Sequence, residues 1–153
     1  MNLQKFTVKA QETVQQAVEL AASKNHQGVE PPHLMHAFLS DQGGIVVSIL
    51  QRLGANLDAL SGRVDQAMDR LPVVTGASVS GQYVGTDLKK VFDRALAEAE
   101  LLQDAYVSSE HLLVALAESK DAVGEALRQQ GVTKEKVLQA LKDVRGSQRA
   151  DDP

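Results

Sequence analysis

The chain has no cysteine and no tryptophan, and aromatic side chains make up only 3% of its 153 residues. Without cysteine, no disulfide framework can form, and such a composition suits a reducing cytoplasm, where we expect the protein to be located. Because aromatics are scarce, the core must consist of Leu, Val, Ile and Ala, which favours closely packed helices over a β-sandwich. A chain of this length forms one domain and buries roughly two-thirds of its unfolded surface.

Long apolar runs and an excess of positive charge are also missing. The segment Met1–Phe6 has no apolar run that could serve as a signal peptide, and no stretch approaches the roughly 18 apolar residues that a membrane span needs. The net charge is −4 and the pI is about 5.5, so nothing in the charge attracts nucleic acid or an anionic membrane. We therefore expect neither nucleic acid nor a membrane as a partner.

One motif is present twice. The segment Val29–Leu39 is echoed by Val107–Ala117, and the histidines of the two copies, His33 and His111, lie 78 positions apart. The match extends on both sides of each segment. We therefore predict two copies of one helical unit related by a pseudo-twofold axis, residues 1–71 and 87–146, which meet at a seam or groove.

Apolar residues recur at helical spacing through both copies. Four helices are expected in each copy, and the matching Gly54 and Gly131 end the third helix of each. We expect Asp87, Ser108 and Thr133 to cap helices of the second copy. The sequence thus predicts an all-α fold of eight helices in two four-helix repeats, each with a core of its own.

Residues 72–86 contain no charged side chain and are rich in Gly, Ser and β-branched residues. We interpret them as the connector between the repeats. A connection of this length is unusual inside a compact domain, and we expect it to lie across a functional surface.

Catalytic and cofactor motifs are not evident. The glycines of Gly76–Tyr83 have the spacing of a phosphate-binding loop, but the lysine that neutralises the phosphates is missing, so we expect no ATP binding and no cofactor in this chain. Glu30, His33 and His36 form an incomplete metal set, because zinc needs three or four well-placed ligands. A histidine at a helix start that hydrogen-bonds to the backbone explains His33 better. The chain therefore resembles a binding module rather than an enzyme.

Two carboxylates, Asp104 and Glu110, flank the predicted helix start at Ser108. In one interpretation, Glu110 only stabilises the positive end of the helix dipole, by about 0.3–1 kcal/mol. In the other, the two carboxylates lie beside an exposed helix start and hold a basic or amide-rich peptide. The residues alone favour the first interpretation.

A resemblance to a known family is carried by the following residues: Phe6–Thr7, Glu30–Met35, Ser108–Leu113, Gly54, Gly131, Asp69–Pro72 and Met1–Leu3. Together they resemble the N-terminal domain of the Clp ATPases, and the last two segments resemble the ClpB-type branch. The resemblance covers residues 1–146, so that residues 147–153 would begin a linker.

The resemblance implies an all-α double repeat tethered to two ATPase modules outside this chain, which would bind ATP and magnesium. It implies a full-length homohexameric disaggregase that works with the Hsp70-type chaperone system, whereas the isolated domain would be a monomer. Its partners would be unfolded or aggregated proteins, hereafter clients. The alternative within the family is the N-terminal domain of a ClpA- or ClpC-type unfoldase, which binds an adaptor or a tagged substrate for proteolysis.

The resemblance also assigns site residues. The family's client-contact surface includes a threonine and two acidic residues, which correspond here to Thr7, Asp104 and Glu110. Its apolar groove would include Val91 and Phe92, with Tyr83 and Val84 at the rim. The first repeat has Glu30–Pro32 where the second has Ser108–Glu110, so acidic contacts should be asymmetric and belong to the second repeat. Polar residues at groove positions, Arg94, Glu98 and His111, limit the extent of the groove.

Overall fold

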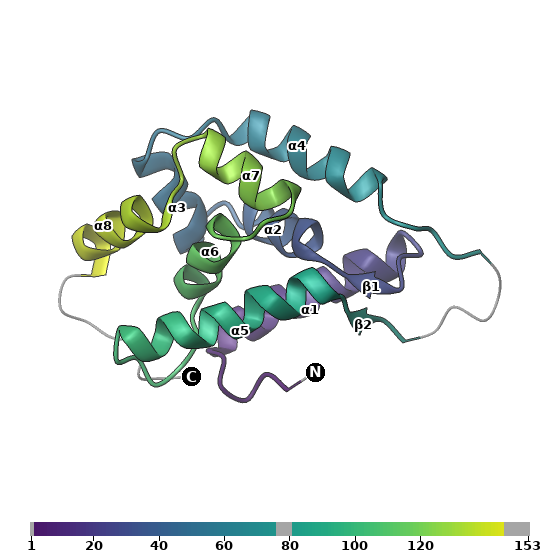
Figure 1. Ribbon diagram of the computed structural model, residues 1–153, viewed down its shortest axis with the longest axis horizontal. Coiled ribbons are helices and arrows are strands. Elements are labelled where there is room, and N and C mark those ends of the chain that lie inside the picture. Colours follow the sequence, from purple (N-terminus) through teal and green to yellow (C-terminus); the bar gives the residue numbers. More distant parts are fainter. Residues whose placement is uncertain (1, 76–80, 146–153) are drawn as a thin grey trace.

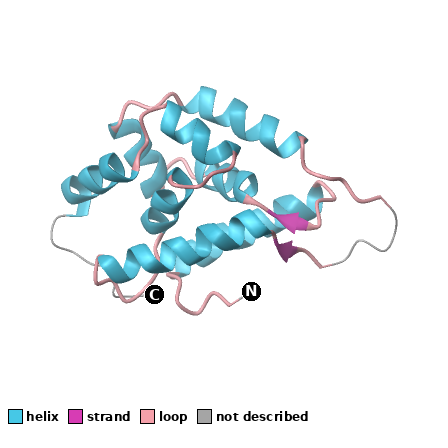
Figure 2. Cartoon of the chain, viewed as in Figure 1, coloured by secondary structure: helices cyan, strands magenta, loops and turns pink. Residues whose placement is uncertain are grey.

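The computed structural model describes residues 2–75 and 81–145, which form eight helices and two short strands (Figures 1 and 2). The first repeat contains α1 (Val8–Ser23), β1 (Gly28–Val29), α2 (Pro31–Ser40), α3 (Ile45–Arg52) and α4 (Leu57–Asp69). The second contains β2 (Tyr83–Val84), α5 (Thr86–Leu101), α6 (Ser109–Ala117), α7 (Ala122–Gln129) and α8 (Lys134–Arg145). The predicted eight-helix, two-repeat architecture is confirmed.

Helix starts follow ordinary capping chemistry, with one correction. Thr7, Asn56 and Asp121 each accept a backbone N–H bond in the first turn of α1, α4 and α7. The expected cap of α5 at Asp87 is wrong, because α5 begins one residue earlier and its N-cap is Gly85. Asp87 lies instead in the first turn, where a carboxylate favours the positive end of the helix dipole.

Helix ends repeat between the two copies. Asn25 after α1 and Gln103 after α5, 78 positions apart, both have a φ of 59°. Gly54 after α3 and Gly131 after α7 have φ values of 74° and 78°, a conformation in which a Cβ is strained. The predicted stops at the two glycines are therefore confirmed.

The two repeats exchange short β-pairings (Figure 2). In the parallel pair β1–β2, Val29 of the first repeat lies opposite Val84, which precedes α5 of the second repeat. The equivalent pair, shifted by 78 positions, is a parallel bridge between Val107 and Phe6. Each repeat therefore pairs the residue before its second helix with the residue before the other repeat's first helix, as a pseudo-twofold arrangement requires.

The buried apolar side chains of both repeats form one continuous cluster among the described residues. Between the repeats, α4 packs against α7, α3 against α6 and α8, and α2 against α5 and α7. Our expectation of a separate core in each repeat is thus wrong. The reason is that helices of about ten residues, such as α2 and α6, are buried on nearly all sides by helices of both copies.

The expected connector, residues 72–86, contains structure that the sequence did not predict. Its last part forms β2 and the first residue of α5, while the N–H of Val74 donates to the carbonyl of Asn25 at 2.9 Å. Residues 76–80, and with them most of the phosphate-loop candidate, lie outside the described part of the chain, as do residues 147–153. None of the described helices is both long and apolar enough to cross a membrane.

Candidate functional site at the start of α6

The repeated histidine begins the second helix of each repeat and is buried in both, with 0% exposure for His33 and 1% for His111. In α2, the N–H of Glu30 donates to Nδ1 of His33 at 2.9 Å. In α6, the N–H of Ser108 donates to Nδ1 of His111 at 2.8 Å. These bonds satisfy a backbone donor just before each helix, and the predicted backbone-bonded histidine is confirmed.

The two histidines differ in the partner of the other ring nitrogen. Nε2 of His33 lies 2.8 Å from Nδ1 of His26, whereas Nε2 of His111 lies 2.7 Å from Oδ2 of Asp104. His26 and Asp104 are themselves 78 positions apart. Since Nδ1 of each repeated histidine accepts a backbone N–H, its proton is on Nε2, from which it donates to the partner. The second repeat therefore has a carboxylate where the first has an imidazole.

Burial disfavours the protonated form of these imidazoles. Desolvation, with His26 as a further positive neighbour, lowers the pKa of His33 to about 4. Desolvation also lowers the pKa of His26. At His111, desolvation lowers the pKa while the hydrogen bond to Asp104 opposes the shift. A neutral ring at His33 and His111 is the form that can accept the backbone N–H.

The two predicted acidic residues, hereafter the acidic pair (Asp104 and Glu110), come together at the start of α6. The second interpretation, in which the carboxylates lie beside an exposed helix start, is wrong about the exposure, since the Asp104 side chain is 0% exposed and that of Glu110 is 9% exposed. Both face Arg145 at the end of α8: Nη2 lies 2.9 Å from Oδ2 of Asp104, and Nε lies 3.8 Å from Oε2 of Glu110. Carboxylates this buried are stable only with such partners.

Thr7 lies beside the same helix start. Its N–H donates to the carbonyl of Val107 at 2.8 Å, two residues before α6 begins. Its hydroxyl accepts the N–H of Ala10 at 3.2 Å, so Thr7 also caps α1. Thr7, which is distant in the sequence, therefore lies beside the segment 104–110 that carries the acidic pair.

The predicted groove residues on α5 are covered to different extents. Val91 is 2% exposed and belongs to the core. Phe92 is half-buried and meets the ring of Phe6 edge to face, with centroids 5.4 Å apart and an interplanar angle of 89°. Phe92 contacts Phe6, which directly precedes Thr7, so Phe92 lies next to the α6 start. Val91 contributes only to the packing of the core.

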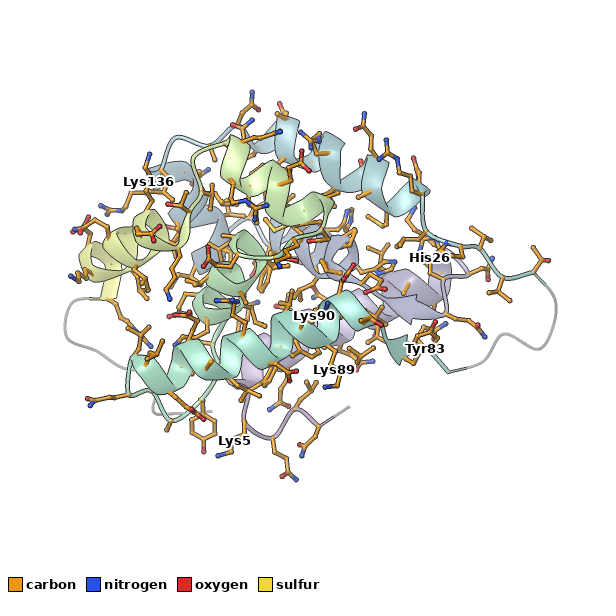
Figure 3. All side chains as sticks on the ribbon, in the orientation of Figure 1. Lys5, His26, Tyr83, Lys89, Lys90 and Lys136 are labelled. Carbon is orange, nitrogen blue, oxygen red and sulfur yellow. The ribbon has the colours of Figure 1, made fainter. Side chains whose placement is uncertain are left out.

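The predicted rim residues lie elsewhere. Tyr83 and Val84 form β2, and Tyr83 is 60% exposed at the end of the molecule that carries His26, away from Lys5 beside Phe6 (Figure 3). Tyr83 lines a cavity of about 170 Å³ with Gly28, Leu71 and Pro72. The structure therefore separates the seven predicted residues into the α6 start, the core and the β2 end. Their role as client contacts stays a prediction.

Sequence reasoning missed three buried polar side chains. It gave no role to Arg145, whose side chain is only 12% exposed. Glu98 is 4% exposed and pairs with Lys134 of α8 at 2.8 Å, which ties α5 to α8. Sequence reasoning also gave no role to His26. The 78-position offset places His26 opposite Asp104 and could have identified it. Between α6 and α7 the second repeat is one residue shorter, so the position opposite Arg145 is Met68, an apolar residue that gives no signal.

Metal ligation finds no support at this place. Within residues 2–75 and 81–145, no three His, Asp or Glu side chains gather in a way that could hold a metal ion. His36, a member of the incomplete set in the sequence, instead lies 3.9 Å from Asp65 of α4. The chemistry that the α6 start offers is recognition of a cationic or hydrogen-bond-donating group by carboxylates.

The sequence is similar to N-terminal regions of bacterial chaperones. It matches the family described as "Clp repeat (R) N-terminal domain" over residues 5–130. It is 39% identical to the chaperone protein ClpB of Bacillus cereus over 151 residues, and 36% identical to that of Vibrio cholerae over 153 residues. The aligned parts cover 97% and 100% of this chain, but only 17% and 18% of the two relatives.

Solved structures share the fold. The N-terminal domain of Hsp104 from Candida albicans has a TM-score of 0.81 at 21% identity, with 97% of each chain covered. The N-terminal domain of ClpV1 from E. coli has a TM-score of 0.79 at 20% identity, covering 99% of this chain and 91% of that chain. With the family match and the ClpB similarity, this establishes that the chain belongs to the Clp repeat N-terminal domain family and is a domain of the ClpB type.

Proposed function

We propose that this domain binds exposed segments of unfolded or aggregated proteins, and that it does so at the start of α6. The observation that carries the proposal is the convergence of Thr7 with the acidic pair. These carboxylates already face a guanidinium, that of Arg145, which supports a preference for cationic groups at this place. Clients with basic side chains or free backbone N–H groups present the same chemistry.

Phe6 and Phe92 would add apolar contact beside these polar groups. Phe92 is half-buried, so part of its ring is available to a client, whereas Phe6 is 2% exposed and serves as its support. The exposed Arg94 interrupts the apolar surface on the same helix, whereas Glu98 is buried and pairs with Lys134. A small apolar patch with carboxylates favours weak, promiscuous binding, with a dissociation constant of about 1 µM or weaker.

A relative with this fold binds a peptide. The complex of the ClpV N-domain with a VipB peptide has a TM-score of 0.67 with this chain at 16% identity, covering 93% of this chain and 90% of that chain. Peptide binding is therefore within the capacity of the fold. For this chain it supports the proposal without indicating which surface is used.

The full-length protein would be a ClpB-type disaggregase in the cytoplasm. ATP and magnesium would bind in ATPase modules outside this chain, which itself would bind no cofactor and catalyse no reaction. The isolated domain would be monomeric, and in a homohexamer several such domains would bind one aggregate, so that weak sites add avidity. Transfer of clients would involve an Hsp70-type chaperone system, with neither nucleic acid nor a membrane as a partner.

The test is binding of a labelled, permanently unfolded client to the isolated domain, followed by fluorescence anisotropy. The triple variant Thr7→Ala, Asp104→Asn, Glu110→Gln removes the polar contacts with little change in shape. We expect its affinity to fall about tenfold or more, which corresponds to the loss of about 1.4 kcal/mol. The control is Asp65→Asn on α4, which removes an exposed carboxylate from another surface. Wild-type affinity in a folded triple variant would refute the site.

A further inference from the structure

Arg145 is the last residue of α8 and the last residue that the structure describes before residue 146. Its guanidinium reaches back to the α6 start, with Nη2 2.9 Å from Oδ2 of Asp104. In Figure 1, the ends of α8 and α5 lie on the same side of the molecule. The same carboxylates that we assign to clients thus hold a side chain of the domain itself.

This internal contact is close but poorly aligned. Nη2 of Arg145 is buried, yet it makes no hydrogen bond of acceptable geometry despite its short distance to Asp104. Oδ2 of Asp104 also accepts the shorter hydrogen bond from Nε2 of His111, at 2.7 Å. Glu110 lies farther from the guanidinium, 3.8 Å from Nε. A buried donor without an aligned acceptor lowers the stability of the contact. Another cationic group can therefore replace the guanidinium of Arg145 at a lower free-energy cost.

The scaffold itself does not require this arginine. In the first repeat, the position equivalent to Arg145 is Met68 in the last turn of α4, 77 positions earlier, the same offset as between Gly54 and Gly131. Met68 is 1% exposed and belongs to the apolar core. The first repeat nevertheless keeps its buried histidine and its helix start. Arg145 is therefore an addition of the second repeat, at the place where the acidic pair also occurs.

We propose that Arg145 is a resident competitor for the acidic pair, which a client must displace in order to bind. Displacement frees the last turn of α8 and thereby loosens the point at which the chain continues beyond residue 145. Client binding at α6 is in this way coupled to the order of the last turn of α8. This inference rests on the proposed function, since it assigns clients to the same carboxylates.

The first experiment measures the affinity of the same unfolded client for Arg145→Gln. If the guanidinium occupies the acidic pair about nine-tenths of the time, its removal strengthens the apparent affinity about tenfold. Arg145→Lys, which keeps a cation, should lie between the wild type and Arg145→Gln. The matched control is Arg52→Gln, because Arg52 of α3 pairs with the exposed Asp143 and does not reach the acidic pair. Circular dichroism verifies that each variant is folded.

The second experiment follows amide hydrogen exchange in the last turn of α8, residues 142–145, in the wild-type domain. Client addition should accelerate exchange there about fivefold or more, and α4 serves as the internal control. The proposal that Arg145 competes with clients would be overturned by unchanged or slower exchange in the last turn of α8. It would also be overturned if Arg145→Gln and the wild type bound the client with equal affinity. If the triple variant loses binding while Arg145→Gln binds like the wild type, the competitor fails and the client site stands. If the triple variant binds normally, the client site itself fails.

Discussion

His26 and Asp104 occupy equivalent positions in the two repeats and hydrogen-bond to equivalent histidines, yet one is an imidazole and the other a carboxylate. The duplicated scaffold therefore contains one neutral pair, His26 with His33, and one charged pair, Asp104 with His111. Only the charged pair attracts an arginine, Arg145, from another helix. Divergence at a single position thus places an ion pair in the second repeat where the first has a contact between two imidazoles.

The neutral pair makes stability depend on pH. The pKa of His33 is about 4 in the folded domain and about 6.5 in the unfolded chain. Above pH 6.5 the His33 ring is neutral in both the folded domain and the unfolded chain, so its contribution to the free energy of unfolding is fully present. Between about pH 6.5 and 4, the unfolded chain binds a proton that the folded domain does not, so the free energy of unfolding falls by up to about 1.4 kcal/mol per pH unit.

Urea unfolding across this pH range measures the slope, and NMR of the His33 ring measures the folded-state pKa directly. An NMR midpoint for His33 at or above pH 6.5 would contradict the buried neutral ring.

Glu30 should stabilise α5 across the boundary between the repeats. Its carboxylate accepts the N–H of Leu88 at 3.3 Å, in the first turn of a helix whose own N-cap is glycine. Glu30→Ala removes this acceptor and should cost about 1 kcal/mol in urea unfolding. Glu30→Gln keeps an oxygen that can accept the hydrogen bond. It also removes the cost of burying a charged carboxylate, the cost that raises the pKa of Glu30, so its free energy of unfolding should stay within about 0.5 kcal/mol of the wild type. Equal losses in both variants would show that Glu30 does not act as a cap.

Two glycine substitutions should have opposite effects. A Cβ on Gly85 would collide with the Glu30 carboxylate, so Gly85→Ala should displace Glu30 from α5 and cost about 1 kcal/mol. Gly62 lies exposed in α4 with open space around it, so Gly62→Ala should stabilise the domain by about 0.5–1 kcal/mol. Thermal unfolding of the two variants checks the signs. A stabilising Gly85→Ala would refute the contact.

Phe6 should be a principal contributor to stability near the α6 start. It is 2% exposed, packs on Phe92 and pairs with Val107, so Phe6→Ala should cost about 3–4 kcal/mol. The neighbouring Val8 is 53% exposed, and Val8→Ala should change the free energy of unfolding by less than about 0.5 kcal/mol. Chemical denaturation compares the two. A small loss in Phe6→Ala would mean that the packing of the Phe6 side chain against Phe92 is dispensable.

The sequence was sufficient to predict the helices, their two-repeat arrangement and several of their ends. These features follow from local signals such as apolar periodicity, the glycines at 54 and 131, and the repeated histidine. The strand pairing of Val29 with Val84 was not predictable, because two-residue strands leave no alternating pattern. The single core was missed for a related reason, since periodicity identifies a buried face but not the helix that covers it.

The candidate site was only partly predictable. The acidic pair was found through resemblance, but its burial depends on Arg145, which approaches from the end of α8 through tertiary packing. The resemblance placed Tyr83 and Val84 at the rim of the groove, whereas β1 holds them at the opposite end of α5 from Asp104. A position along the chain does not determine which end of a helix a contact uses.

The most direct test of the client site is an amide chemical-shift map of the domain titrated with an unfolded client. The account predicts that the largest shifts occur at Thr7, at residues 107–110 and in the last turn of α8, with little change in α4. Shifts confined to β2 around Tyr83 and to the start of α2, with the α6 start unchanged, would contradict it.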